Sequence, residues 1–287
     1  MSVGAFELPV VAHDGHRTML QARVPAAPVA TLLWLGGMGI AARHFLPFAD
    51  ALAERGIAVF AHDWRGLGSS SVRASRHEDW GYRALLTQDL PACEAAIEHA
   101  LPGLRRIVGG HSLGGQLASC RLGLAQGTAS ALWLVASGTP DWRAFPPRTR
   151  WWLPMAYQAL RSIAVLCGKL PGRRLGFGGE ESRGVVRDWS RTGLTGRYAG
   201  TGVSTDLEAA LRTVTVPIRT VRMARDWLAP ASSLAALLAK MPEAPHSIAV
   251  LDEAAPGERA DHYAWMKHPG RTADALLCDN PAASMAP

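Results

Sequence analysis

The sequence of residues 107–117 is IVGGHSLGGQL, and it decides the fold expected for this chain. It contains a Gly-x-Ser-x-Gly pentapeptide, Gly110 to Gly114, behind a short β-branched run, and a helix-forming segment follows at about Gln116–Ala125. A strand, a sharp turn that carries a serine and a helix together form a nucleophile elbow. We expect Gly110 and Gly114 to be required, because side chains there would collide with neighbouring backbone at the strained Ser112 turn.

Short apolar runs alternate with helical patterns on both sides of this elbow. Strands are expected at Ala5–Val11, Thr18–Val24, Val29–Leu35, Ile57–Ala61, Arg105–Gly109, Ser130–Ser137, Val216–Met223 and Ser247–Leu251. Helices are expected at Ala42–Arg55, Glu78–Ala100 (kinked at Pro91), Gln116–Ala125 and Ala231–Lys240, with a last helix that starts near Met266 or Arg271 and ends at Leu277. This alternation predicts an α/β fold with a mostly parallel sheet covered by helices on both faces.

The alternation stops at Gly138 and resumes after Thr213. Residues 139–213 contain prolines, glycines and one amphipathic stretch, Trp151–Leu166, without a buried-strand pattern. A segment of this length is too long for a bare loop in a compact domain, so it is expected to be an insertion with helices of its own. The predicted organisation is a core formed by residues 1–138 and 214–287, with a cap formed by residues 139–213.

The positive charge of the chain is concentrated in this predicted cap. The net charge is +6; Asp141–Gly200 holds eleven Lys/Arg against four Asp/Glu, which leaves nineteen and twenty for all other residues. Three uses fit this pattern: arginines that attract an anionic or carrier-bound substrate, contact of Trp151–Met155 with a membrane surface, and simple solubility of an apolar lid. The candidate substrate-binding residues are Trp142, Trp151 and Trp152.

Composition excludes several other classes of protein. Among the 287 residues no run approaches the roughly 20 apolar residues of a membrane span, and Met1–Val11 lacks the pattern of a signal peptide. The four cysteines have no metal-like spacing, and no dinucleotide fingerprint is present, so neither metal nor cofactor is expected. We expect a cytoplasmic protein that does not bind nucleic acid; a dimer is one option for its oligomeric state.

Taken together, the motifs resemble those of the α/β-hydrolase superfamily, in its serine-esterase, lipase and serine-aminopeptidase-like branches that carry a cap after the sixth strand. The matching pieces are Gly36-Gly37-Met38-Gly39, Asp63-Trp64-Arg65-Gly66-Leu67-Gly68-Ser69, Gly110–Gly114, Asp226 with Pro230, and His262. The resemblance implies an eight-stranded sheet and a triad in the order serine, acid, histidine. It also implies that Asp63 and Arg65 belong to a structural loop.

The acid and the base must therefore follow Ser112 along the chain. Asp226 follows the strand at Val216–Met223, at the carboxyl end where parallel sheets place their sites. Asp252 is the alternative acid, and Asp261 is disfavoured because it is adjacent to the proposed base. His262 is the expected base because it follows a loop containing Pro256-Gly257, as in the family.

Two departures from the family pattern keep alternatives open at this point. Asp261 stands where a glycine commonly precedes the histidine, so His268 remains a second candidate base. The resemblance implies that the oxyanion is held by the N–H groups of Leu113 and Met38. Family members often have His-Gly where this chain has Gly36-Gly37, which leaves the anchoring of that loop open.

The predicted function is a serine hydrolase that cleaves an ester or thioester of a small to medium acyl substrate through Ser112, His262 and Asp226. The alternatives are an acyltransferase, an aminopeptidase-like amidase and a non-catalytic ligand receptor. An intact candidate triad argues against the receptor, but a structure in which the three residues are not mutually hydrogen-bonded would revive it.

Overall fold

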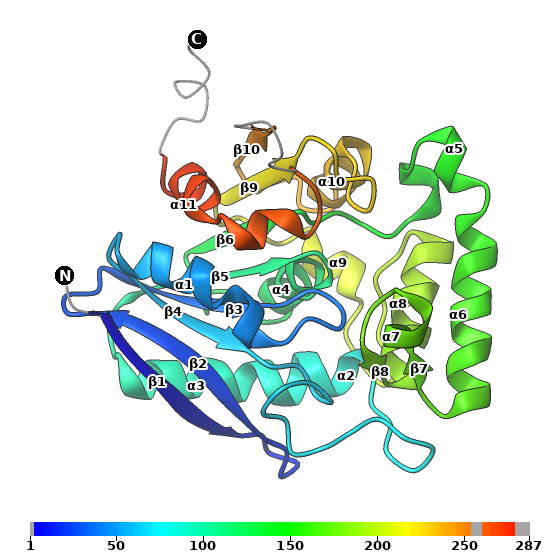
Figure 1. Cartoon of the computed structure of the whole chain (residues 1–287), viewed down its shortest axis with the longest axis horizontal. Coiled ribbons are helices and arrows are strands. Elements are labelled where there is room, and N and C mark those ends of the chain that lie inside the picture. Colours follow the sequence, from blue (N-terminus) through cyan, green and yellow to red (C-terminus); the bar gives the residue numbers. More distant parts are fainter. Residues whose placement is uncertain (1–2, 254–259, 279–287) are drawn as a thin grey trace.

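The core of the molecule is one eight-stranded sheet (Figure 1). The computed structural model describes residues 3–253 and 260–278. The strands are β1 (Val3–Val11), β2 (Arg17–Pro25), β3 (Ala30–Leu35), β4 (Ile57–His62), β5 (Arg105–His111), β6 (Ala131–Val135), β9 (Ile218–Met223) and β10 (His246–Leu251). Their order is β1-β2-β4-β3-β5-β6-β9-β10; β1 and β2 pair antiparallel with their neighbours and the others are parallel. The predicted α/β class and sheet are confirmed.

Helices cover both faces of this sheet, as the uniformly apolar central strands require. All six residues of β3 and of β4 are buried, which is typical of strands covered on both faces. One apolar core includes residues of α3 (Leu90–Ala100), α4 (Leu113–Leu124) and α10 (Ala231–Leu238). The other includes residues of α1 (Leu46–Ala53) and α11 (Gly270–Leu277).

The helix expected at Glu78–Ala100 starts later than predicted. It begins with the single turn α2 (Tyr82–Ala84) and continues through a π-helical turn, Leu85–Asp89, into α3. The wide turn lies just before Pro91, which lacks the N–H that a regular α-helix needs there. Residues 78–81 stay outside the helix, where the carbonyl of Trp80 accepts a hydrogen bond from the Ser182 hydroxyl (2.7 Å).

The segment between β6 and β9 folds into helices of its own and one very short hairpin. Its elements are a 3-10 turn (Trp142–Ala144), α5 (Pro147–Arg150), α6 (Leu153–Cys167), β7 (Leu170–Pro171), α7 (Gly172–Leu175), β8 (Glu180–Glu181), α8 (Arg183–Thr195) and α9 (Leu207–Leu211). The hairpin β7–β8 has two residues per strand, too few for a periodic pattern in the sequence. Figure 1 shows α5 to α8 beside one end of the sheet.

The segment is held on the core by buried polar contacts. Asp188 of α8 is completely buried, and its carboxylate accepts hydrogen bonds from the Tyr82 N–H (3.1 Å) and the Thr201 hydroxyl (2.9 Å). The final helix α9 packs directly on α4, and its Leu207 and Leu211 belong to the core cluster. In the described part of the chain, no helix is long and apolar enough to cross a membrane.

Candidate active site

Ser112 lies at the turn between β5 and α4, in the strained conformation that the elbow motif predicts. Its φ is 53° and its ψ is −120°, a region that residues other than glycine rarely adopt. A Cβ atom at Gly110 would lie 2.3 Å from the carbonyl carbon of Gly114, and one at Gly114 would lie 2.0 Å from the carbonyl oxygen of Leu35. Both elbow glycines are therefore required by contact with backbone, which cannot move aside.

His262 and Asp226 form a buried hydrogen-bonded pair. His262 Nδ1 lies 2.8 Å from Asp226 Oδ2, and both residues are 5 % exposed. The other carboxylate oxygen, Oδ1, accepts the N–H groups of Leu228 and Ala229, each at 2.9 Å. These contacts fix the carboxylate, and a carboxylate on Nδ1 favours the tautomer in which Nδ1 carries the proton and Nε2 is free to act as a base.

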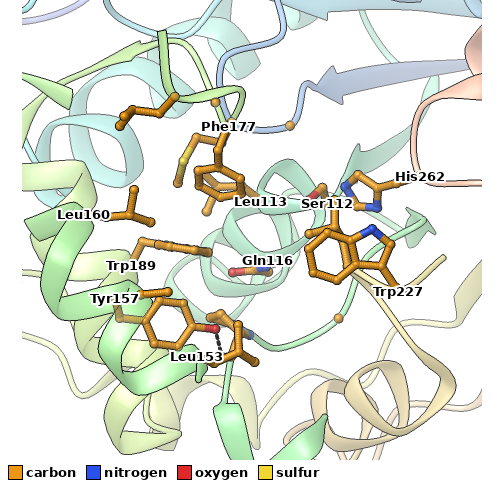
Figure 2. Close-up of a pocket in the computed structure, with 18 of the residues that line it drawn as sticks. Ser112, Leu113, Gln116, Leu153, Tyr157, Leu160, Phe177, Trp189, Trp227 and His262 are labelled. Carbon is orange, nitrogen blue, oxygen red and sulfur yellow. Dashed lines mark hydrogen bonds between the residues drawn. The ribbon is translucent and has the colours of Figure 1, made fainter. Parts of the chain in front are cut away.

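The Ser112 hydroxyl and the His262 ring face the same cavity. Both line it, and Figure 2 shows their side chains next to each other. Among the described residues no hydrogen bond joins Ser112 Oγ to His262, so the mutual hydrogen bonds of the predicted triad are not complete and the receptor alternative stays open. In proteins without substrate, catalytic hydrogen bonds are often long and tighten only when substrate binds.

The other candidate acids and bases have different surroundings. Asp252 lies near Arg271 with its side chain 79 % exposed. Asp261 Oδ1 accepts the N–H groups of Tyr263 (3.0 Å) and Ala264 (2.8 Å), so it caps the turn after His262. His268 is exposed and is absent from the described cavity lining. The predicted loop with Pro256-Gly257 lies outside the described residues.

His111, inside the elbow, supports the loop that carries the predicted base, His262. Its Nε2 donates to the carbonyl oxygen of His262 (2.9 Å), and the two rings lie 4.6 Å apart between centroids. Burial holds the pKa of His111 well below its usual value, with a contribution from the neighbouring His262. A neutral His111 can donate this bond without placing a second positive charge beside the base.

The loop that follows β3 supplies the second predicted oxyanion donor, Met38. No backbone acceptor is found within the described residues for the N–H of Met38 or of Leu113, so both remain available. The Trp64 indole N–H donates to the Gly36 carbonyl (2.8 Å). A Cβ at Gly37 would lie 2.7 Å from His111 Nδ1. Gly37 therefore makes room for His111, and Trp64 anchors the loop through Gly36.

A carboxyl group from the segment between β6 and β9 also holds this loop. Glu181 of β8 is 7 % exposed and accepts the N–H groups of Gly179 (3.2 Å between N and Oε1) and Gly39. Gly39 lies so close to Gly178 and Gly179 that a Cβ on it would be 2.0 Å from the Gly179 nitrogen. Burial raises the pKa of Glu181 to about 7, although both N–H groups act in the opposite direction.

The cavity has a volume of about 450 Å³ and mostly apolar walls. Its lining includes Met38 and Trp152. Figure 2 shows Leu113 and Trp227 in the wall, together with Leu160, Phe177 and Trp189 of the segment between β6 and β9. Of the three predicted tryptophans only Trp152 lines the cavity. Trp142 and Trp151 are absent from its described lining; their rings lie 6.0 Å apart, and Arg143 and Arg150 stack on them.

Sequence reasoning missed several lining residues. Trp227 adjoins the predicted acid and Trp189 lies within residues 139–213, the predicted cap, so their positions give a weak signal. Gln116 follows Ser112 by one helical turn, which is a signal that spacing alone could have given. No Lys, Arg, Asp or Glu is found among the described lining residues.

Asp63 and Arg65 are engaged elsewhere. Asp63 accepts the N–H groups of Ala42 (2.8 Å) and Ser69 (2.9 Å), and Arg65 binds Asp89 and Asp14. Neither lines the cavity in the described structure. Residues 3–253 and 260–278 contain no group of three or more His, Cys, Asp or Glu side chains that could hold a metal ion.

Comparison with solved structures shows many proteins of the same fold. An esterase from Exiguobacterium antarcticum is 17% identical, with 95% of this chain and 98% of that chain covered and a TM-score of 0.62. An α/β-hydrolase from Penicillium sp. sh18 is 18% identical with the same coverage and a TM-score of 0.62. A deformylase from Pseudomonas putida S16 is 19% identical over 94% and 98% of the chains, with a TM-score of 0.59. No curated protein matches the chain.

The sequence itself also matches a known family. The model of the family described as "Serine aminopeptidase, S33" matches residues 26–255, which include Ser112, Asp226 and the loop with Met38. The match covers most of the sheet and the whole segment between β6 and β9. The chain therefore belongs to the serine aminopeptidase S33 family and is a hydrolase of the α/β-hydrolase superfamily.

Proposed function

We propose that this protein is a serine hydrolase that cleaves an ester or thioester of a small to medium, uncharged acyl substrate. The observation that carries the proposal is the 2.8 Å contact between His262 Nδ1 and Asp226 Oδ2 beside a cavity that His262 shares with Ser112. Residues 139–213 act as a cap that supplies one wall of this cavity.

The reaction proceeds through an acyl-enzyme. Ser112 Oγ attacks the carbonyl carbon while His262 Nε2 accepts its proton, and the N–H groups of Leu113 and Met38 bind the oxyanion. His262 then protonates the leaving alcohol or thiol. Water attacks the acyl-enzyme with His262 as base and releases the acid. Asp226 orients His262 and stabilises its charged form.

The charge of the cavity wall favours ester over peptide substrates. An aminopeptidase must bind the positively charged amino terminus of its substrate, and a carboxylate is the usual partner for a buried ammonium group. The described lining contains no carboxylate, and it contains no arginine or lysine for an anionic acyl group. An uncharged acyl chain therefore suits this cavity better than either charged substrate.

The proposal is tested by labelling with a fluorophosphonate probe, which reacts with activated serines. We expect wild type to be labelled at Ser112, and Ser112→Ala to lose labelling; Ser162→Ala, at an exposed serine of α6, is the matched control. Equal labelling of Ser112→Ala and wild type would refute the proposal.

Asp226→Asn should lower kcat on p-nitrophenyl esters by about a thousandfold or more, because the wrong tautomer of His262 becomes favoured.

A further inference from the structure

A buried polar side chain in the cavity wall has no hydrogen-bond partner among the described residues. Three buried polar side chains lie in the wall away from the His262 ring: Gln116, Thr139 and Tyr157. The Tyr157 hydroxyl donates to the Pro140 carbonyl (2.5 Å), and Thr139 Oγ1 accepts the Asp141 N–H (3.3 Å). Gln116 is only 5 % exposed; its Oε1 atom is buried without a hydrogen-bond partner, and within the described structure no hydrogen bond is found for its Nε2 either.

The helix places this amide close to the nucleophile. Ser112 caps α4, and the N–H of Gln116 donates back to the Ser112 carbonyl (3.3 Å), so the two residues are one helical turn apart. Side chains at this spacing lie on the same face, roughly 5–6 Å apart at Cβ. Figure 2 shows the amide inside the cavity, between Ser112 and Trp189.

A buried amide without a partner destabilises the protein, whereas an apolar residue of similar size would not. The neighbours of Gln116 in α4, Leu113 and Leu117, are apolar and buried, so nothing in the local packing requires an amide. A substrate group that forms hydrogen bonds with Gln116 would supply the missing partner. That group must be uncharged, since the described cavity wall has no ion to balance a charge.

We infer that Gln116 recognises a hydroxyl group on the acyl chain, close to the carbonyl that Ser112 attacks. A hydroxyl both donates and accepts, so it can satisfy the amide in either of its two orientations. The substrates are then short acyl esters that carry a hydroxyl near the reacting carbonyl and are otherwise apolar. This inference builds on the proposed function and adds the substrate class.

The test compares three p-nitrophenyl esters: hexanoate, 3-hydroxyhexanoate and 6-hydroxyhexanoate. For wild type we expect kcat/KM to be about tenfold or more higher for the 3-hydroxy ester than for hexanoate, without a similar gain for the 6-hydroxy ester. In Gln116→Leu the ratio of 3-hydroxy ester to hexanoate should fall to about one. Gln158→Leu, an exposed residue of α6, is the matched control and should keep the wild-type ratio.

Binding measurements separate this inference from the proposed chemistry. The dissociation constants of the same esters are measured by calorimetry with Ser112→Ala and with the double variant Ser112→Ala/Gln116→Leu. Tighter binding of the 3-hydroxy ester that depends on Gln116 supports the inference even if wild type hydrolyses neither ester, an outcome that would refute the proposed function alone. Hydrolysis of both esters with a ratio of one, or an equal loss on both in Gln116→Leu, would overturn the inference.

Discussion

At the elbow, single residues are packed so closely that a larger side chain cannot fit. Gly110 and Gly114 surround Ser112, and the atoms that a methyl group would meet are backbone atoms of α4 and of the residues at the end of β3. His111, between the two glycines, packs against the ring of His262 and bonds to its carbonyl. The same few residues therefore set the strain of the nucleophile and the position of the base.

Replacement of Gly114 by alanine should destabilise the whole protein. The new Cβ would lie 2.0 Å from the Leu35 carbonyl oxygen, so β3 and the elbow would have to separate. We expect a loss of about 3 kcal/mol in the free energy of unfolding, at the upper end of overpacking effects, measured by urea denaturation.

The control is Gly270→Ala in the first turn of α11, where a Cβ meets nothing within 4 Å. This substitution should be neutral or stabilise the fold by up to about 1 kcal/mol. Equal stability of the two variants would contradict the close approach seen at Gly114.

Among the elements, the hairpin β7–β8 connects the segment between β6 and β9 to the loop with Met38. The Gly172 N–H donates to the Gly179 carbonyl (2.7 Å), which keeps the chain before β8 folded back on itself. Glu181 then accepts N–H groups from both Gly179 and Gly39. The wall of the cavity and the loop with the proposed oxyanion donor are thus held together by one buried carboxyl group.

This arrangement predicts a pH dependence of stability. The pKa of Glu181 is about 7 in the folded protein, above the ordinary value of 4.5. The folded state therefore binds a proton that the unfolded state has lost, and stability falls as the pH rises from about 4.5 to about 7. Above pH 7 the full cost of burying the charge remains.

Glu181→Gln should remove this loss, since its amide stays neutral. We expect the variant to have a higher Tm than wild type at pH 8 and no such advantage at pH 5. Glu180→Gln is the control, because the Glu180 side chain is one-third exposed and pairs with Lys169 at the surface. A wild-type-like Tm of Glu181→Gln at both pH values would contradict the predicted cost of a charged Glu181.

At the scale of the whole molecule, one buried ionic network connects three distant parts of the chain. Asp89, at the end of the π-helical turn, binds Arg65 from the loop after β4 (2.7 Å) and His16, the residue before β2 (3.1 Å). Arg65 also binds Asp14 in the hairpin turn (2.7 Å). Burial alone would raise the pKa of Asp89, but hydrogen bonds from His16 and Arg65 hold it below its usual value.

Asp89→Asn should therefore leave a buried arginine without its main partner. We expect a loss of about 3–5 kcal/mol in the free energy of unfolding, because the Asp89 side chain is completely buried. In Asp50→Asn the pair with Arg23 is lost at a carboxylate that is 51 % exposed, and the loss should stay below about 1 kcal/mol. Urea denaturation of both variants checks this, and similar losses would show that burial does not decide the strength of these pairs.

The parts of this protein that depend on local pattern can be predicted from the sequence. The alternation of apolar runs and helices predicts the sheet, and the glycine spacing predicts the strained Ser112 turn, because both follow from backbone geometry within a few residues. Asp226 and His262 were proposed from their order along the chain, and the fold brings them into contact. The start of the second long helix was misplaced, since contacts with the distant Ser182 hold residues 78–81 outside it.

What the cavity presents to a substrate depends on contacts between distant parts of the chain. Its walls combine Trp152 and Trp189 of the segment between β6 and β9 with Trp227, which follows β9. Their meeting depends on how that segment docks, through contacts such as Asp188 with Tyr82, 106 residues apart. Local periodicity carries no information on such pairs. The missing partner of Gln116 is likewise visible only once every neighbour has its place, because hydrogen-bond satisfaction is a property of the packed molecule.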